Sequence, residues 1–188
     1  LREELRVQLP EIFIDRGTVV VYATSEPEEA LLLGGKTALI NDGSVAQFGE
    51  TIEIYRKPAT LIAAQVFSNP PLNKIEFSKK GNFAHLSSKK SWKLHGKITE
   101  KSNGRYTLGI RPHHVSPNKN EKCDISFTER ITAAELSGSE SSAHFNLGNE
   151  NWVSLAHGLH HYSVGDNCEF HIDSDNFLFF SSEGDCIV

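Results

Sequence analysis

The 188-residue sequence predicts two folds in succession, an α/β segment over residues 1–67 and a small all-β barrel or sandwich over residues 72–188. Three observations predict this organisation. Apolar residues recur at helical spacing before residue 68, and residues 18–23 form a continuous apolar run of the kind that suits a strand buried on both faces. After residues 68–71, which contain two prolines and break any regular element, the helical period disappears. Residues 68–71 are therefore expected to link two domains.

The first segment is expected to alternate helix and strand. An amphipathic helix is predicted before Gly17, kinked at Pro10, and its apolar positions are Leu1, Leu5, Leu9, Ile12 and Phe13. The strand over residues 18–23 leads to a helix start at residues 24–30, where Ser25 and Glu28 have capping-box spacing and Pro27 is tolerated in the first turn.

A short β-hairpin is predicted next, because residues 37–40 and 45–48 are apolar and enclose the turn Asn-Asp-Gly-Ser at residues 41–44. Two helices should follow, over residues 51–57 and 58–67. In the second segment, seven apolar runs separated by Gly, Asn, Ser and Lys clusters predict strands, and about 118 residues suffice for an independent core. These runs are 73–77, 106–110, 124–131, 143–147, 152–156, 168–172 and 177–180.

Composition excludes several functional classes. No apolar run approaches the ~20 residues of a transmembrane helix. The net charge of −5 argues against a nucleic-acid binder. Residues 74–101 form a basic stretch, with eight Lys against Glu76 and Glu100, but no pattern of interleaved aromatic residues is recognised there that would support base stacking. That stretch is interpreted as solvated strand faces. Because the sequence begins with Leu and contains no Met, we expect a fragment or a processed chain.

Metal binding is not expected from the cysteines or the nine histidines. Cys123, Cys168 and Cys186 are far apart and form no CxxC pair. The pairs 113–114 and 160–161 are sequence neighbours, and adjacent side chains on a strand point to opposite faces, so one pair does not readily chelate one ion.

Several motifs together resemble the closing third of the ATPase domain of ABC transporters. The first segment carries T-S-E-P-E-E-A, then N-D-G-S-V-A-Q-F-G, then Y-R-K-P. The importer ATPases for maltose and glycerol-3-phosphate carry T-H-D-x-x-E-A, D-x-G-x-[VI]-x-Q-x-G and Y-x-x-P in the same order. The stretch G-I-R-P-H-H at residues 109–114 resembles the G-[IV]-R-P-E-H motif of that family's C-terminal TOBE domain, and residues 135–140 fit its E-x-x-G-x-E repeat.

The resemblance implies a fold, an activity and partners. Residues 1–67 would be the C-terminal segment of a RecA-like ABC ATPase core, residues 68–71 the linker, and residues 72–188 an OB-like TOBE barrel for regulation and dimerisation. The whole subunit would use ATP and Mg. Its partners would be a second ATPase subunit, in a homodimer or a heterodimer, and transmembrane permeases, at the cytoplasmic face of the membrane, with no nucleic acid. No phosphate loop G-x-x-x-x-G-K-[ST] is present, so the fragment alone should neither bind nor hydrolyse ATP.

Ser25 is the informative departure from the family pattern. The resemblance implies that this position holds a switch histidine, which contacts the ATP γ-phosphate and orients the attacking water, and that Glu26 stands where the family has Asp. Serine donates a hydrogen bond but cannot shuttle a proton near neutral pH. Two interpretations stay open: an impaired half-site in which Ser25 faces the γ-phosphate, or a simple helix cap.

Two further motifs are expected to be structural. Arg111 and Pro112 begin a turn, and the resemblance implies that this motif holds the barrel together. Residues 136–140 read L-S-G-S-E and are similar to the ABC signature L-S-G-G-Q. They lie within the β half, however, so a turn of the barrel is expected, since phosphate binding by that signature needs a helix N-terminus.

The sequence therefore favours part of the ATP-binding subunit of an importer for a carbohydrate or polyol, with glycerol or glycerol-3-phosphate as candidate solutes. The alternative is an oxyanion- or small-ligand-binding TOBE module without a transport role, since the Lys-rich stretch would attract anions. The α/β segment distinguishes the two, because a free-standing oxyanion binder would not need it.

Overall fold

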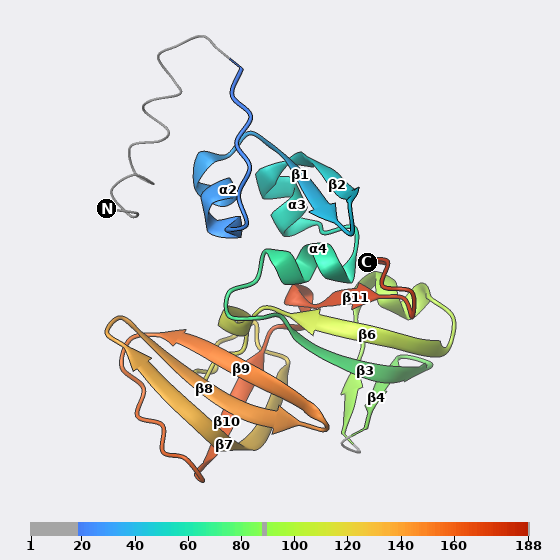
Figure 1. Ribbon diagram of the computed structural model, residues 1–188. Helices are drawn as coiled ribbons and strands as arrows, with labels where there is room; N and C mark the ends of the chain where they lie inside the picture. Colours follow the sequence, from blue (N-terminus) through green and yellow to red (C-terminus); the bar gives the residue numbers. More distant parts are fainter. Residues whose placement is uncertain (1–18, 88–89, 188) are drawn as a thin grey trace. The chain divides into compact units, whose positions relative to one another are not determined.

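The computed structural model describes residues 19–87 and 90–187, and the chain divides into two compact units, residues 1–67 (unit 1) and 68–188 (unit 2) (Figure 1). The helix expected before Gly17 lies outside the described residues. Unit 1 contains α2 (Pro27–Leu33), β1 (Lys36–Asn41), β2 (Ser44–Glu50), α3 (Thr51–Arg56) and α4 (Leu61–Val66). Unit 2 contains β3 (Asn73–Lys80), β4 (Phe83–Leu86), β5 (Ser91–Lys93), β6 (Gly104–Ile110), β7 (Ile125–Ser137), β8 (Glu140–Leu147), β9 (Glu150–His157), β10 (Asn167–Ile172) and β11 (Leu178–Phe180), with 3₁₀ turns η1 (Gly96–Glu100), η2 (Pro112–His114) and η3 (Ser174–Asn176).

The predicted hairpin of unit 1 is confirmed. Strands β1 and β2 pair antiparallel, and the turn between them places both Asp42 (φ 48°) and Gly43 (φ 73°) in the left-handed region. An Asp-Gly pair is favoured there because a tight hairpin turn of this kind needs positive φ at both central residues. The inward-facing Leu39 of β1 then packs with Ile54 of α3, Ala63 of α4 and Phe67, which form the small core of unit 1.

Two expectations for unit 1 are wrong. Among residues 19–23 no strand forms, and Val19 and Val21 are 96% and 92% exposed. A strand buried on both faces needs neighbouring strands and covering helices, which the described residues do not supply. The last helix begins at Leu61 rather than at Pro58, because the hydroxyl of Thr60 accepts a hydrogen bond from the backbone N–H of Ala63 (3.1 Å) and caps it there.

Unit 2 is all-β, as its seven apolar runs predicted. Its strands form a five-stranded sheet in the order β11-β6-β3-β4-β5 and a four-stranded sheet in the order β10-β7-β8-β9, and every pairing is antiparallel (Figure 1). All seven predicted strands are present. The short strands β4 and β5 were missed because four and three residues within a Lys- and Ser-rich stretch give little periodic signal.

Three hydrogen bonds join β3 of the five-stranded sheet to β9 of the four-stranded sheet. The side chain of Asn73 donates to the carbonyl oxygen of Val153 and accepts from its backbone N–H, both at 2.7 Å. The indole Nε1 of Trp152 donates to the carbonyl oxygen of Lys74 at 2.9 Å. Because Asn73 and Trp152 are buried, these bonds satisfy groups that water cannot reach. They close the two sheets into one barrel.

Aromatic side chains fill the space between the two sheets. Trp152, Phe145, Phe170 and Phe180 are among the largest side chains without exposed surface. The rings of Phe145 and Phe170 stack with centroids 4.3 Å apart, and the ring of Trp92 from β5 stacks with that of Phe177 at 6.0 Å. Burial of such rings contributes strongly to stability, so the packing of Trp92 anchors β5 despite its length.

We predict that Asn73→Ala destabilises the full chain by about 3 kcal/mol, because the backbone N–H and carbonyl groups of Val153 lose their partner inside the protein. The control is Asn151→Ala, since Asn151 is exposed on the strand that carries Val153. Urea unfolding followed by tryptophan fluorescence measures both variants. Equal midpoints for the two would show that the reciprocal bonds do not hold the barrel closed.

Candidate functional site

The segment that carries Ser25 and Glu26 lies in unit 1, between the extended residues 19–24 and helix α2. Ser25 occupies a bend and is exposed to solvent. Glu26 is the N-cap residue, with extended backbone angles (φ −102°, ψ 104°), and Pro27 opens the helix, as the sequence predicted. Pro is suited to this place because its missing N–H is one that the helix start leaves unbonded in any case.

The predicted capping box of Ser25 and Glu28 is wrong. No side chain caps α2, and the Ser25 hydroxyl forms no hydrogen bond with any residue that the structure describes. The reason is that Thr24 takes the local role instead, because its Oγ1 accepts the backbone N–H of Glu26 at 2.9 Å. Interpretation of Ser25 as a simple helix cap therefore loses its structural basis.

A buried carboxylate organises this segment. Glu29, in the first turn of α2, is only 7% exposed, and its Oε2 accepts hydrogen bonds from the hydroxyl of Tyr22 (3.0 Å) and the hydroxyl of Thr24 (2.5 Å). A carboxylate with so little exposure must be satisfied by donors, and bonds to a charged acceptor are the strong ones. The carboxylate of Glu29 thus holds the side chain of Thr24, and Thr24 in turn holds the backbone N–H of Glu26. Ser25 lies between these two residues in the chain.

Among the described residues the hydroxyl of Ser25 has no hydrogen-bond partner, while hydrogen bonds hold both of its neighbours, Thr24 and Glu26. Such a hydroxyl can donate a hydrogen bond to an anionic oxygen. It has no pKa near neutrality and no positive charge, so it can position a reacting group but cannot exchange a proton with it. Sequence reasoning missed the role of Glu29, although a carboxylate four residues after Ser25, beside the apolar Ala30, is a usable signal.

Arg111 and Pro112 lie in unit 2, at the start of the 3₁₀ turn η2. Both are buried, and the turn is closed by bonds from the backbone N–H groups of His114 and Val115 to the carbonyl oxygens of Arg111 (3.0 Å) and Pro112 (3.1 Å). The carbonyl oxygen of Val115 also accepts from the hydroxyl of Ser154 in β9 at 2.6 Å. The turn therefore leads from one sheet to the other. Its structural role stays a prediction.

The two histidines of this turn lie side by side, and the pKa of each is lowered. Their centroids lie 4.3 Å apart. Burial, the neighbouring ring of His113 and the charge of Arg111 lower the pKa of His114 from 6.5 to about 4. Burial, Arg111 and His157 also lower the pKa of His113. Two adjacent rings beside a guanidinium resist protonation because each added proton places like charges together.

The structure also shows the surroundings of the signature-like stretch and of the possible metal ligands. The L-S-G-S-E stretch at residues 136–140 forms the tight turn between β7 and β8, in which Ser137 pairs with Glu140 and Gly138 has φ 65°, as predicted. Within residues 19–87 and 90–187, no three His, Cys, Asp or Glu side chains lie close enough together to hold a metal ion. In the same residues no helix has both the length and the apolar character to cross a membrane.

No protein-family model matches the chain. Curated relatives do match it. The chain is 26% identical over 193 residues to the uncharacterized ABC transporter ATP-binding protein YcjV of Escherichia coli O6:H1, a match that covers 100% of this chain and 53% of the relative. It is 29% identical over 194 residues to the sn-glycerol-3-phosphate import ATP-binding protein UgpC of Paraburkholderia xenovorans, which covers 96% of this chain and 51% of that protein.

These relatives confirm the resemblance to ABC transporter ATP-binding proteins that the sequence motifs indicated. The chain spans about half the length of the curated relatives it matches. Among solved structures, the molybdate-binding protein ModG aligns with 57% of this chain and 93% of its own, at 12% identity and a TM-score of 0.41. A likeness at that level establishes nothing about the ligand or fold of this chain.

We predict that the stability of the chain falls steeply between pH 6.5 and pH 4, in part because of His114. Its pKa is lowered to about 4 in the folded chain, so the unfolded chain takes up the proton first as the pH falls. The stability that the neutral ring contributes is complete above pH 6.5 and is lost as the pH approaches 4. His114→Gln should therefore flatten the fall in melting temperature across this range.

The matched control is His161→Gln, because His161 is an exposed histidine outside the turn. Thermal unfolding of both variants and the unaltered chain, in steps from pH 7 to pH 4, gives the comparison. A His114→Gln variant with the same pH slope as the unaltered chain would mean that the half-buried ring of His114 does not resist protonation.

Proposed function

We propose that this chain is the C-terminal part of the ATP-binding subunit of an ABC importer for a carbohydrate or polyol, with glycerol or glycerol-3-phosphate as candidate solutes. The observation that carries the proposal is the similarity over the whole chain to ABC transporter ATP-binding proteins, one of which is named for import of sn-glycerol-3-phosphate. The match falls in the C-terminal portion of those relatives. In this proposal, unit 1 belongs to a RecA-like ATPase core and unit 2 is its TOBE domain.

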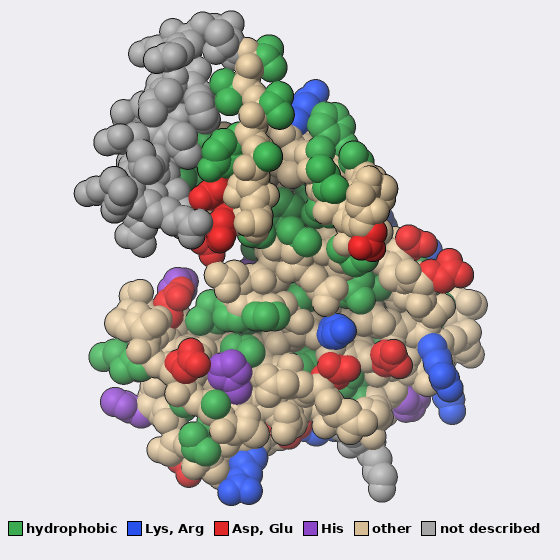
Figure 2. Space-filling model, viewed as in Figure 1, with side chains coloured by type: hydrophobic (Ala, Val, Ile, Leu, Met, Phe, Trp, Pro, Cys, Tyr) green, Lys and Arg blue, Asp and Glu red, His purple; other side chains and the backbone are tan. Residues whose placement is uncertain are grey.

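The surface of unit 1 supports its assignment to a larger domain. Hydrophobic side chains gather on this unit (Figure 2), and many large ones are exposed, among them Ile40, Val45 and Phe48 of the hairpin. Ile40 and Val45 are cross-strand partners, while the inward-facing Leu39 is buried. The hairpin thus has apolar residues on both faces. Contiguous exposed apolar surface of this kind marks a face that another part of a protein covers.

The geometry around Ser25 supports a place at the nucleotide. In the proposed subunit, ATP and Mg are held mainly by a phosphate loop and Walker B residues, which this sequence does not contain. From this chain, the exposed hydroxyl of Ser25 would face the γ-phosphate, with Glu26 beside it. Thr24 donates to Glu29 and accepts from the backbone N–H of Glu26, and these two bonds would hold the backbone on both sides of Ser25 without occupying the Ser25 hydroxyl.

Ser25 would then contribute positioning without acid-base chemistry. Phosphoryl transfer depends on the placement of the attacking water and on stabilisation of charge at the γ-phosphate. A histidine reaches farther than a serine and carries a proton near neutral pH. Loss of one positioning donor commonly costs ~10²–10³ in rate. The proposed half-site is therefore impaired, and a sister ATPase subunit would supply the histidine in a heterodimer.

The remaining parts of the proposal concern assembly. Such a subunit would bind a second ATPase subunit and transmembrane permeases at the cytoplasmic face of the membrane, as a peripheral protein. The barrel of unit 2 would serve dimerisation and regulation. A chain of this composition, with a net charge of −5, is not expected to bind nucleic acid.

We predict that Ser25→His in the intact subunit, assembled with its partners, raises single-turnover ATP hydrolysis at this half-site by ~10²-fold or more, with little change in nucleotide affinity. The sister site is inactivated by substitution of its catalytic carboxylate. The matched control is Ser44→His, which places the same ring at an exposed hairpin position of unit 1.

Equal turnover of the Ser25 protein and its histidine variant would overturn the impaired half-site. Failure of the intact subunit to bind ATP at all, or to associate with permeases, would overturn the importer assignment itself.

A further inference from the structure

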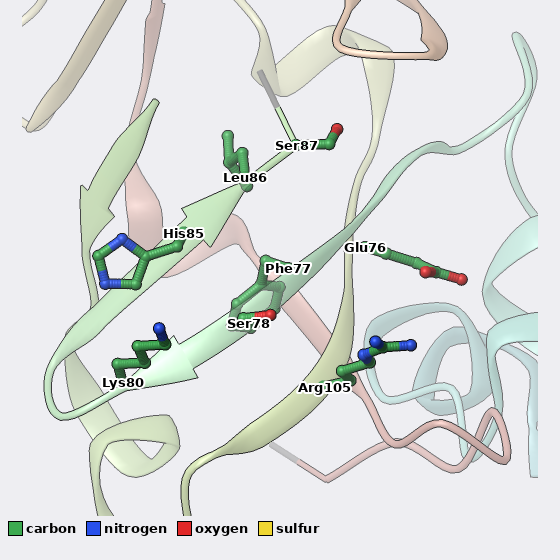
Figure 3. Close-up of a pocket in the computed structure, with 8 residues that line it drawn as sticks. All are labelled: Glu76, Phe77, Ser78, Lys80, His85, Leu86, Ser87 and Arg105. Atoms are coloured by element: carbon green, nitrogen blue, oxygen red, sulfur yellow. The ribbon is translucent and has the colours of Figure 1, made fainter. Parts of the chain in front are cut away.

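A hollow of about 390 Å³ lies on the five-stranded sheet of unit 2, over strands β3, β4 and β6 (Figure 3). Its lining combines polar side chains that face away from the aromatic core with Phe77 and Leu86, which belong to that core. Cavities of this size are typical of small-molecule sites. Apart from Arg105, the lining residues come from the Lys-rich stretch at residues 74–101, which the proposed function leaves without a role.

The strand register places three of its polar side chains in one row. Ser78 of β3 is the cross-strand partner of His85 on β4 and also of Arg105 on β6. Directly opposed side chains of neighbouring antiparallel strands have Cβ atoms about 5 Å apart. One hydroxyl therefore stands between an imidazole and a guanidinium.

Two further charged residues flank Ser78 along its own strand. Lys80 and Glu76 lie two positions on either side, on the same face of β3, because side chains alternate along a strand. Figure 3 shows Lys80 and His85 on one side of Ser78 and Arg105 with Glu76 on the other. One end of the hollow, at Lys80 and His85, is therefore basic. The other end, at Arg105 and Glu76, carries both a cation and a carboxylate, and the hydroxyl of Ser78 lies between the two ends.

Two lysines of the stretch already have partners among the described residues, whereas the two cations of the hollow do not. Lys79 turns inward and donates to the carbonyl oxygen of Gly81 (2.8 Å), and Lys90 forms an ion pair with Glu129. Lys80 and Arg105, in contrast, form no hydrogen bond or ion pair with any described residue. Their full donor capacity is available to a ligand.

His85 is prepared to donate as well. Its Nδ1 lies 2.8 Å from the hydroxyl of Ser91 on the neighbouring strand β5. When that hydroxyl donates, the neutral ring carries its proton on Nε2, which is then a donor. A phosphate group suits such a set because its several oxygens accept from Lys, Arg, His and Ser together.

The carboxylate of Glu76 restricts the kind of anion that fits the hollow. A bare dianion gains from Lys80 and Arg105 but is repelled by Glu76, whose carboxylate instead accepts hydrogen bonds from hydroxyl groups. A phosphate monoester that carries hydroxyls satisfies both ends of the hollow. The site is open and its side chains are exposed, so the ligand would exchange readily.

We propose that the hollow bounded by Ser78, Lys80, His85 and Arg105 binds a small hydroxylated phosphate monoester, with Glu76 accepting from a ligand hydroxyl. The site lies on the barrel and uses no residue of the proposed ATPase segment. Its occupancy is therefore independent of whether the importer assignment is correct, and it gives the barrel a means of sensing a metabolite.

The test is titration of the full chain with glycerol 2-phosphate and, separately, with inorganic phosphate, followed by NMR shifts of the backbone amide of Ser78 and the ring of His85. We expect saturable shifts with both, and tighter binding of glycerol 2-phosphate. Arg105→Gln and Lys80→Gln should each weaken binding by about tenfold, the usual effect of removing a charged hydrogen-bond partner. Lys122→Gln, an exposed lysine in the loop before β7, is the control and should have no effect.

Glu76→Gln separates specific binding from general attraction of anions. This substitution should strengthen the binding of inorganic phosphate, because the repulsion is removed, and should reduce the preference for glycerol 2-phosphate. Non-saturable shifts, or equal losses in the Lys122 and Lys80 variants, would overturn the proposal. Sedimentation with phosphatidylglycerol vesicles distinguishes a lipid headgroup, and vesicle binding that depends on Arg105 without binding of the free monoester would also overturn it.

Discussion

The barrel of unit 2 depends on the contact between the first strand of one sheet and the last hairpin of the other. The side-chain amide of Asn73 both donates to and accepts from the backbone of Val153, and the residues beside these two, Lys74 and Trp152, add the indole hydrogen bond. These bonds join residues about 80 positions apart and hold the two sheets against their shared aromatic core. Trp152 has a double role, since its ring fills the core and its N–H closes the barrel.

Much of the fold could be predicted because short-range signals dominate it. The Asp-Gly turn determines the hairpin of unit 1, and apolar alternation identified seven strands of unit 2. The predictions that were wrong needed information outside the local sequence. Residues 19–23 have the composition of a buried strand, but composition does not supply the neighbours that such a strand needs. Strand β5 has only three residues and is held by the packing of Trp92, which no local period reveals.

In the candidate site, too, local sequence predicted some features, whereas others depend on contacts between residues that are brought together by folding. The resemblance identified Ser25 from motif order, but the expectation that it caps α2 was wrong because Thr24 already bonds the backbone of Glu26. The buried carboxylate of Glu29 and the row of Ser78, His85 and Arg105 depend on which side chains are placed together across turns and strands. Charge counting found the basic stretch but did not show which of its lysines pair with other groups.

The distance along the chain between Asn73 and Val153 also has a consequence for how the barrel forms during synthesis. Chains are made at about 5–20 residues per second, so β3 leaves the ribosome roughly 4–16 seconds before β9. Hairpins form in microseconds, and the β3–β4 pair is therefore complete long before its partner across the barrel exists. During that interval the amide of Asn73 is satisfied by water, and the apolar face of β3 has no second sheet. The newly made strand is then open to capture by a chaperone or by another nascent chain.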